Sequence, residues 1–266
     1  MSTRVLPEPT FARTRLGSGP ALVVAHGASS SFEGTWGPIL KGLTAHHTVV
    51  GIDYPGSGDT PRSPTPLSLD DLADQMVAAA VAEGLDTFAL AGFSLGGPVA
   101  IRAATRHPER VSALVLTAAF ARPDNNLTLI GSVWEQLAAS GDRELLAEFL
   151  LPVALSPRAL EALSADQLRA TLGYTAASSA DGTPEQAALV TRVDVRDDLA
   201  GLNVPTLVIS ATADRTVAPA LHRELAEQIT GAQFAEIDTG HVVALERPEE
   251  WLRLITDFLA GQHHGA

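Results

Sequence analysis

The sequence predicts an α/β fold, in which a mostly parallel β-sheet is flanked by helices on both faces and an all-helical cap is inserted between two strands. Three observations support this fold class. Short apolar runs recur along the chain, and amphipathic helical patterns separate most of them. The alternation stops between residues 120 and 203, where only helical patterns occur. Strands that are apolar throughout and alternate with helices are typical of a parallel sheet covered on both sides.

Six apolar runs are expected to form the strands. Each run is short and bounded by turn-forming residues, as buried strands are. In chain order they are Ala21–Ala25, Thr48–Ile52, Thr87–Ala91, Val111–Thr117, Thr206–Ser210 and Phe234–Ile237.

The segment from Leu69 to Ala80 illustrates the helical patterns between these runs. Apolar residues recur there at spacings of three and four, which gives a helix one apolar face. Ser68 lies just before the pattern and Asp71 lies three residues later, which is an N-terminal capping signature. We therefore expect this helix to begin directly after Ser68.

Residues 120–203 are expected to form the cap, and residues 1–119 and 204–266 the α/β core. The core sheet needs the strands on both sides of the insertion, so we expect a cap over the carboxyl edge of the sheet, where ligands of α/β folds bind. A separate helical domain is the alternative. The helical patterns in the segment are Leu127–Ala138, Glu144–Leu150, Pro157–Leu163, Asp166–Ala177 and Pro184–Val193.

The composition excludes several classes of function. The 266 residues include no cysteine, which excludes disulfides, thiolate metal sites and a cysteine nucleophile. The formal net charge of −13 disfavours nucleic acid as a partner, because phosphate binding needs clustered cations. The sequence contains no His-Glu-x-x-His pair, phosphate loop or dinucleotide fingerprint. We therefore expect no cofactor and no metal.

The hydropathy pattern also bears on location and partners. No apolar run approaches the roughly 20 residues of a membrane helix, and the N-terminal segment lacks the apolar run of a signal peptide. These features favour a cytoplasmic protein that acts on a small molecule and has no membrane partner. The sequence leaves open whether copies of the chain form a homo-oligomer.

The segment Gly92-Phe93-Ser94-Leu95-Gly96 has the pattern G-x-S-x-G between an expected strand and an expected helix. In this context the serine lies on a tight turn and projects its hydroxyl above the sheet. The glycines let neighbouring backbone approach, and the N-terminus of the helix favours negative charge near the serine. Ser94 is therefore the candidate nucleophile.

Together with this turn, further motifs make the chain resemble the α/β-hydrolase fold family with a helical cap. The resemblance covers nearly the whole chain and extends to enol-lactonases and cofactor-free haloperoxidase-type esterases. It implies the order serine, aspartate, histidine for the catalytic residues. The motifs are His26-Gly27, Asp53–Gly58, the serine turn, His107–Val111, Ala213–Val217 and Gly240-His241.

His241 is the candidate general base, because a short turn after the last expected strand presents it at the carboxyl edge of the sheet. A serine hydroxyl needs such a base to accept its proton, and the base needs an acid to orient it. Asp214 follows the strand Thr206–Ser210 and occupies the family's position for the acid. Asp124, just past the preceding strand, is the alternative, since some relatives carry the acid there.

The resemblance also implies an oxyanion hole made of two backbone N–H groups. One belongs to Leu95, directly after the nucleophile. The other belongs to a residue just after His26-Gly27, which is Ala28, with Ser29 as the close alternative.

A mostly apolar pocket is expected beside these groups. Trp134 has two interpretations: its helix face packs on the core, or it overhangs Ser94 and forms the pocket for the acyl or alcohol group. Acidic residues outnumber arginines in the expected cap, which disfavours a strongly anionic substrate. The expected pocket residues are Ser29, Phe93, Trp134, Val217 and Val242.

The expected function is hydrolysis of a small, neutral, moderately apolar ester or lactone through an acyl-enzyme intermediate. Within the family, Ser94 argues against haloalkane dehalogenases and epoxide hydrolases, which carry an aspartate nucleophile. The place of Lys41, the only lysine, argues against hydroxynitrile lyases. Perhydrolases, carbon–carbon bond hydrolases and thioesterases share the triad and stay open. The alternative is a non-hydrolytic member, a biosynthetic cyclase or lyase or a ligand receptor, that uses the same cavity.

Overall fold

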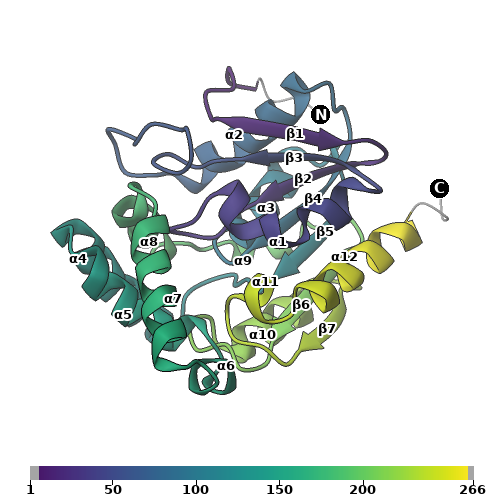
Figure 1. The fold of residues 1–266 in the computed structure, drawn as a ribbon. Helices are drawn as coiled ribbons and strands as arrows, with labels where there is room; N and C mark the ends of the chain where they lie inside the picture. The colour runs from purple at the N-terminus through teal and green to yellow at the C-terminus, as the bar shows by residue number, and fades with distance from the viewer. Residues whose placement is uncertain (1–5, 263–266) are drawn as a thin grey trace.

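The computed structural model describes residues 6–262, in which seven strands form one sheet and twelve helices surround it (Figure 1). The strands are β1 (Arg13–Gly17), β2 (Ala21–Ala25), β3 (Thr48–Ile52), β4 (Phe88–Phe93), β5 (Val111–Thr117), β6 (Thr206–Ala211) and β7 (Gln233–Ile237). The helices are α1 (Phe32–Thr44), α2 (Leu69–Ala82), α3 (Gly96–Arg106), α4 (Asn125–Ser140), α5 (Arg143–Ala154), α6 (Pro157–Glu161), α7 (Ala165–Ser178), α8 (Thr183–Val190), α9 (Arg196–Leu199), α10 (Pro219–Gln228), α11 (Val243–Glu246) and α12 (Pro248–Gln262).

Hydrogen bonding orders the sheet β1-β3-β2-β4-β5-β6-β7, and every neighbouring pair except β1 and β3 is parallel. The predicted α/β fold class is confirmed. All six predicted strands are present, and their observed ends differ from the predicted ones by at most two residues. The strand β4, which leads to Ser94, lies in the middle of the sheet between β2 and β5.

Strand β1 was not predicted from the sequence. This strand lies at one edge of the sheet, pairs antiparallel with β3, and leaves all its side chains exposed. Its sequence, Arg-Thr-Arg-Leu-Gly, has neither an apolar run nor a complete apolar alternation. Charged side chains suit an exposed edge strand because they discourage pairing with another chain. The features that protect the edge therefore removed the signal for a strand.

Two apolar clusters cover the two faces of the sheet. One cluster joins the sheet to α2, α3, α9 and α10, and the other joins it to α1, α11 and α12. On the second face, the Trp36 and Trp251 rings stack with their centroids 4.8 Å apart. With both faces buried, the strands can be apolar throughout, which explains why the sequence revealed them.

The helices α4 to α8 gather beside the core, where Figure 1 shows them in teal and green. The last helix of the insertion, α9, lies apart from this group. Its Asp198 accepts a hydrogen bond from Arg102 Nε of α3 at 3.0 Å, so α9 is held against the core. We propose that residues 120–203 form the cap, with α9 as its docked end. The two ends of the expected core, residues 1–5 and residues 263–266, lie outside the part of the chain that the structure describes.

Among residues 6–262, no helix combines the length and the apolar character needed to cross a membrane.

Candidate active site

Ser94 lies on the turn between β4 and α3 with a φ of +53°, in the left-handed region that residues other than glycine rarely adopt. A Cβ on Gly92 would lie 2.3 Å from the carbonyl oxygen of Gly96. A Cβ on Gly96 would lie 2.3 Å from the carbonyl oxygen of Ala25 in β2. Glycine at both positions therefore permits the tight turn that carries the serine.

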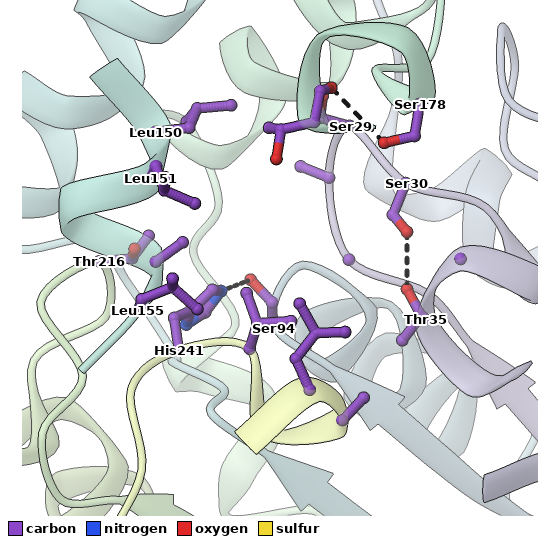
Figure 2. Close-up of a pocket in the computed structure, with 18 of the residues that line it drawn as sticks. Ser29, Ser30, Thr35, Ser94, Leu150, Leu151, Leu155, Ser178, Thr216 and His241 are labelled. Atoms are coloured by element: carbon purple, nitrogen blue, oxygen red, sulfur yellow. Dashed lines mark hydrogen bonds between the residues drawn. The ribbon is translucent and has the colours of Figure 1, made fainter. Parts of the chain in front are cut away.

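A continuous hydrogen-bond chain joins three side chains from different loops. His241 Nε2 lies 3.0 Å from Ser94 Oγ, and His241 Nδ1 lies 2.7 Å from Asp214 Oδ2. A carboxylate can only accept, so Nδ1–H donates to Asp214 and Nε2 is free to accept the hydroxyl proton of Ser94. All three residues are buried, and Figure 2 shows Ser94 and His241 in contact. The structure thus brings the three expected residues together.

The second oxygen of Asp214 is held by the backbone. The N–H groups of Thr216 and Val217 donate to Oδ1 at 2.8 and 2.9 Å, which fixes the plane of the carboxylate. The alternative acid, Asp124, instead caps α4 by accepting the N–H of Leu127 at 2.7 Å. The expectation that Val217 lines the pocket is corrected: its side chain is fully buried in the core, and its backbone serves Asp214.

Glu246, which the sequence analysis did not single out, supports the loop that carries His241. Its Oε1 accepts the N–H of Gly240 at 3.1 Å and the N–H of Ser156 at 2.8 Å, and its Oε2 accepts the Ser156 hydroxyl at 2.5 Å. Ser156 is the N-cap of α6. The carboxylate of Glu246 therefore joins the start of α6, within residues 120–203, to the loop before His241.

The N–H groups of Ala28 and Leu95 are free for an oxyanion: neither donates a hydrogen bond to any group of the described residues. Gly27, just before Ala28, lies so close that a Cβ there would be 3.3 Å from Ser94 Cβ. The N–H of Ser29, the alternative donor, is already bonded to Gln186 Oε1 at 2.8 Å. The geometry therefore favours Ala28 over Ser29.

Gln186 is a second residue that sequence reasoning missed. It lies on α8, is fully buried, and bonds two loops of the core. Its Oε1 accepts from Ser29, while its Nε2 donates to Ser57 Oγ at 2.9 Å and to the carbonyl of Pro55 at 3.2 Å. Its partners lie more than 100 positions away in the chain, so its neighbours in sequence carry no signal of this role. Gln186 holds the loop that presents Ala28.

His26 fixes the same loop from the core side. Its Nε2 accepts the N–H of Tyr54 at 3.0 Å, so its Nδ1–H donates to the carbonyl of Gly27 at 2.7 Å. Complete burial lowers the pKa of His26 to about 4 by desolvating the imidazolium, so the ring is neutral near pH 7. The His-Gly pair therefore has a structural task beside the free N–H of Ala28.

A cavity of about 190 Å³ opens above Ser94 and His241. Ser29, Phe93, Trp134 and Val242, four of the five expected pocket residues, line it, and among residues 6–262 no aspartate, glutamate, lysine or arginine does. Leucines from α5 and its end form one side, and hydroxyl side chains form the opposite side (Figure 2). On the leucine side Figure 2 labels Leu150, Leu151 and Leu155, with Thr216 beside them; on the hydroxyl side it labels Ser29, Ser30, Thr35 and Ser178.

The surroundings of Trp134 match neither interpretation alone, because its side chain packs mainly on other helices of residues 120–203 rather than on the core of the sheet and also lines the cavity. The residue is 8% exposed and belongs to an apolar cluster with Leu146 of α5 and Ala187 of α8. It also lines the cavity above Ser94. Trp134 therefore packs the cap together and offers part of its surface to the cavity.

Within the described residues, no group of three or more histidine, aspartate or glutamate side chains is placed to hold a metal ion.

Comparison with known proteins identifies the family. Residues 20–248 match the family model described as alpha/beta hydrolase fold, so the chain belongs to the α/β-hydrolase fold family. The expectation that it is an enzyme of this family is confirmed.

Two curated relatives align along most of their length. Pyrrolizixenacetamide deacetylase of Xenorhabdus hominickii is 33% identical over 248 residues, which cover 92% of this chain and 93% of the relative. Pimeloyl-[acyl-carrier protein] methyl ester esterase of Xanthomonas campestris pv. campestris is 30% identical over 260 residues, with 92% and 97% covered. Among solved structures, the enol-lactonase from Burkholderia xenovorans LB400 has a TM-score of 0.84 at 24% identity, covering 94% of this chain and 96% of that one. The comparison with the enol-lactonase shows that the two chains share a fold.

Proposed function

We propose that the protein is a serine hydrolase that cleaves a small, neutral, moderately apolar ester or lactone through an acyl-enzyme. One observation carries the proposal. The Ser94–His241–Asp214 chain of hydrogen bonds lies at a cavity whose rim offers the unbonded N–H of Ala28, and Leu95 supplies a second unbonded N–H. Nucleophile, base and oxyanion donors are the parts that acyl transfer needs.

In the acylation step, His241 Nε2 accepts the hydroxyl proton of Ser94 as Oγ attacks the carbonyl carbon of the substrate. The carbonyl π electrons move to its oxygen, and the N–H groups of Ala28 and Leu95 stabilise the negative charge. Asp214 stabilises the imidazolium and keeps its orientation. His241 then returns the proton to the leaving alkoxide, the carbon–oxygen bond breaks, and the acyl group stays on Oγ.

In the deacylation step, a water molecule takes the place of the alcohol. His241 accepts a proton from the water as its oxygen attacks the acyl carbon. The same donors stabilise the second oxyanion, and the proton passes from His241 to Ser94 Oγ as the acid leaves. A lactone would follow the same two steps with its alcohol attached to the acyl group.

The lining of the cavity supports a neutral substrate. A fixed charge on the substrate would find no opposite charge among the lining side chains, and burying it there would be unfavourable. The leucine side suits an apolar group and the hydroxyl side a hydrogen-bonding one. The names of the relatives add an amide as the second candidate, because the 33% identical relative is named a deacetylase of an acetamide.

Activity-based labelling and an activity screen test the proposal. We expect a fluorophosphonate probe to label wild-type protein but not Ser94→Ala, and wild type to turn over some members of a panel of p-nitrophenyl esters, lactones, thioesters and acetanilides of increasing chain length. The variant should lose several orders of magnitude in kcat while its thermal unfolding stays close to wild type. Unlabelled wild-type protein would favour a non-hydrolytic use of the cavity, and a variant with more than about a tenth of wild-type activity would exclude Ser94 as the nucleophile.

A further inference from the structure

His222, on α10, lies beside Asp214 and takes no part in the steps above. It is fully buried and does not line the cavity. Its Nε2 lies 3.7 Å from Asp214 Oδ2, the same oxygen that accepts from His241 Nδ1 at 2.7 Å. Its Nδ1 lies 3.1 Å from Ser210 Oγ of β6. One carboxylate oxygen therefore faces two imidazole rings that come from different elements.

The hydrogen-bonding partners determine where His222 carries its proton. Ser210 is fully buried, and among the described residues its hydroxyl has only His222 Nδ1 as a partner. If Ser210 donates to Nδ1, the neutral ring carries its proton on Nε2, facing Asp214. The other tautomer would leave the Ser210 proton without an acceptor and direct an Nε2 lone pair at a carboxylate, which is unfavourable on both counts. The tautomer with Nε2–H is therefore preferred.

We propose that His222 is a positioning residue for the Ser94 reaction, whose Nε2–H stabilises the Asp214 carboxylate and holds Oδ2 in line with His241. At 3.7 Å the contact is longer than a hydrogen bond, so it acts as an attraction between a charge and a dipole. Such an attraction is stronger here than in solvent because both side chains are fully buried. The inference rests on the proposed function, since it assigns His222 to the same triad.

The contact has an electrostatic consequence for His241. The charged and titratable groups that act on His222 are Asp214 and His241. Burial, the largest effect, lowers the pKa of His222 to about 4, so its ring is neutral over the working range of a hydrolase. The positive end of its N–H dipole opposes an imidazolium at His241. Removing the dipole is expected to favour the imidazolium and to move the acid limb of kcat/KM about half a pH unit upward.

Two conservative variants separate positioning from packing. Glutamine is long enough to place its amide nitrogen where Nε2 lies, so His222→Gln keeps a donor toward Asp214. Asparagine reaches only the position of Nδ1, so His222→Asn keeps the partner of Ser210 and loses the donor. We expect His222→Asn and His222→Leu to lower kcat about tenfold with KM within about twofold, and to move the acid limb upward. His222→Gln should restore most of kcat and the wild-type acid limb.

His107→Leu is the matched control. His107 is also buried and pairs its Nε2 with a carboxylate, Asp74 Oδ1, at 2.8 Å, but it lies at the far end of α3 from Ser94. Thermal unfolding is measured for every variant, because both histidines are buried. We expect His107→Leu to lower stability without moving the acid limb.

The titration of the His241 ring, followed by NMR and assigned with His241→Asn, provides a readout that needs no turnover. In folded His222→Leu we expect the His241 titration to move upward in pH with the acid limb. The inference is overturned if that titration is unchanged, or if His222→Gln behaves as His222→Leu does while both remain folded. Failure of the proposed function looks different, because wild type itself would then show no Ser94-dependent turnover.

Discussion

Replacing Gln186 with leucine tests how far α8 controls the loop that carries Ala28, the proposed oxyanion donor. The substitution keeps the size of the side chain and removes three hydrogen bonds, which join α8 to Ser29, Ser57 and Pro55. Each bond contributes about 1 kcal/mol, and more where the abandoned partner stays buried, as Ser57 does. We therefore expect the free energy of unfolding to fall by about 3–4 kcal/mol and Tm by about 10 °C.

The same change should slow catalysis, because the N–H of Ala28 lies next to the released Ser29. Losing an oxyanion donor outright costs about 100-fold or more in kcat, so a displaced donor is expected to cost about tenfold. Steady-state kinetics on a p-nitrophenyl ester and thermal unfolding measure the two effects. Gln136→Leu is the control, because Gln136 is exposed on α4 and bonds only within its own helix. If Gln186→Leu kept wild-type kcat and unfolded within about 2 °C of wild type, the loop would not depend on the cap.

Two further predictions concern substrate length and pH. Trp134→Ala should raise KM for hexanoate esters more than for acetate esters, because the lost surface would touch only longer acyl chains; equal increases would leave Trp134 a packing role alone. Stability should fall as the pH drops from 6.5 to about 4, because burial lowers the pKa of His26 and of His222 to about 4 and the unfolded chain binds those protons first. Each histidine accounts for up to about 3 kcal/mol of the free energy of unfolding, which is fully present above pH 6.5 and is lost as the pH falls to about 4. Urea unfolding of wild type and of His222→Gln at several pH values should therefore show a smaller loss in the variant.

The buried strands and Ser94 could be predicted because their signals are local. The strands are buried on both faces, so burial forces apolar runs, and the tight turn at Ser94 requires glycines at fixed spacing. Edge strand β1 gave no such signal, because its side chains face solvent. Short helix α9 has one turn and too few residues for a periodic pattern.

The supporting residues of the site could not be predicted, because their roles depend on contacts between segments far apart in the chain. Gln186 meets Ser29 across 157 positions, and nothing near either residue marks the pair. The position of His222 depends on the packing of α10 on β6, which places the ring beside Asp214 and Ser210. Val217 was expected to supply apolar wall beside the triad, but its side chain is buried in the core cluster.

The way the cap is anchored bears on how this scaffold can diverge. The backbones of Gly56 and Gly182 meet so closely that a Cβ on either would lie within 2.3 Å of the other segment, and Glu246 holds the start of α6. Helix α7, between these anchors, buries only Ala176 yet lends Thr171, Tyr174, Thr175 and Ser178 to the cavity lining. Tyr174 and Ser178 are exposed and Thr171 and Thr175 are half-buried, so substitutions at these four positions should cost less stability than substitutions in the core. Substrate preference can therefore change through α7 while the residues around Ser94 stay constant.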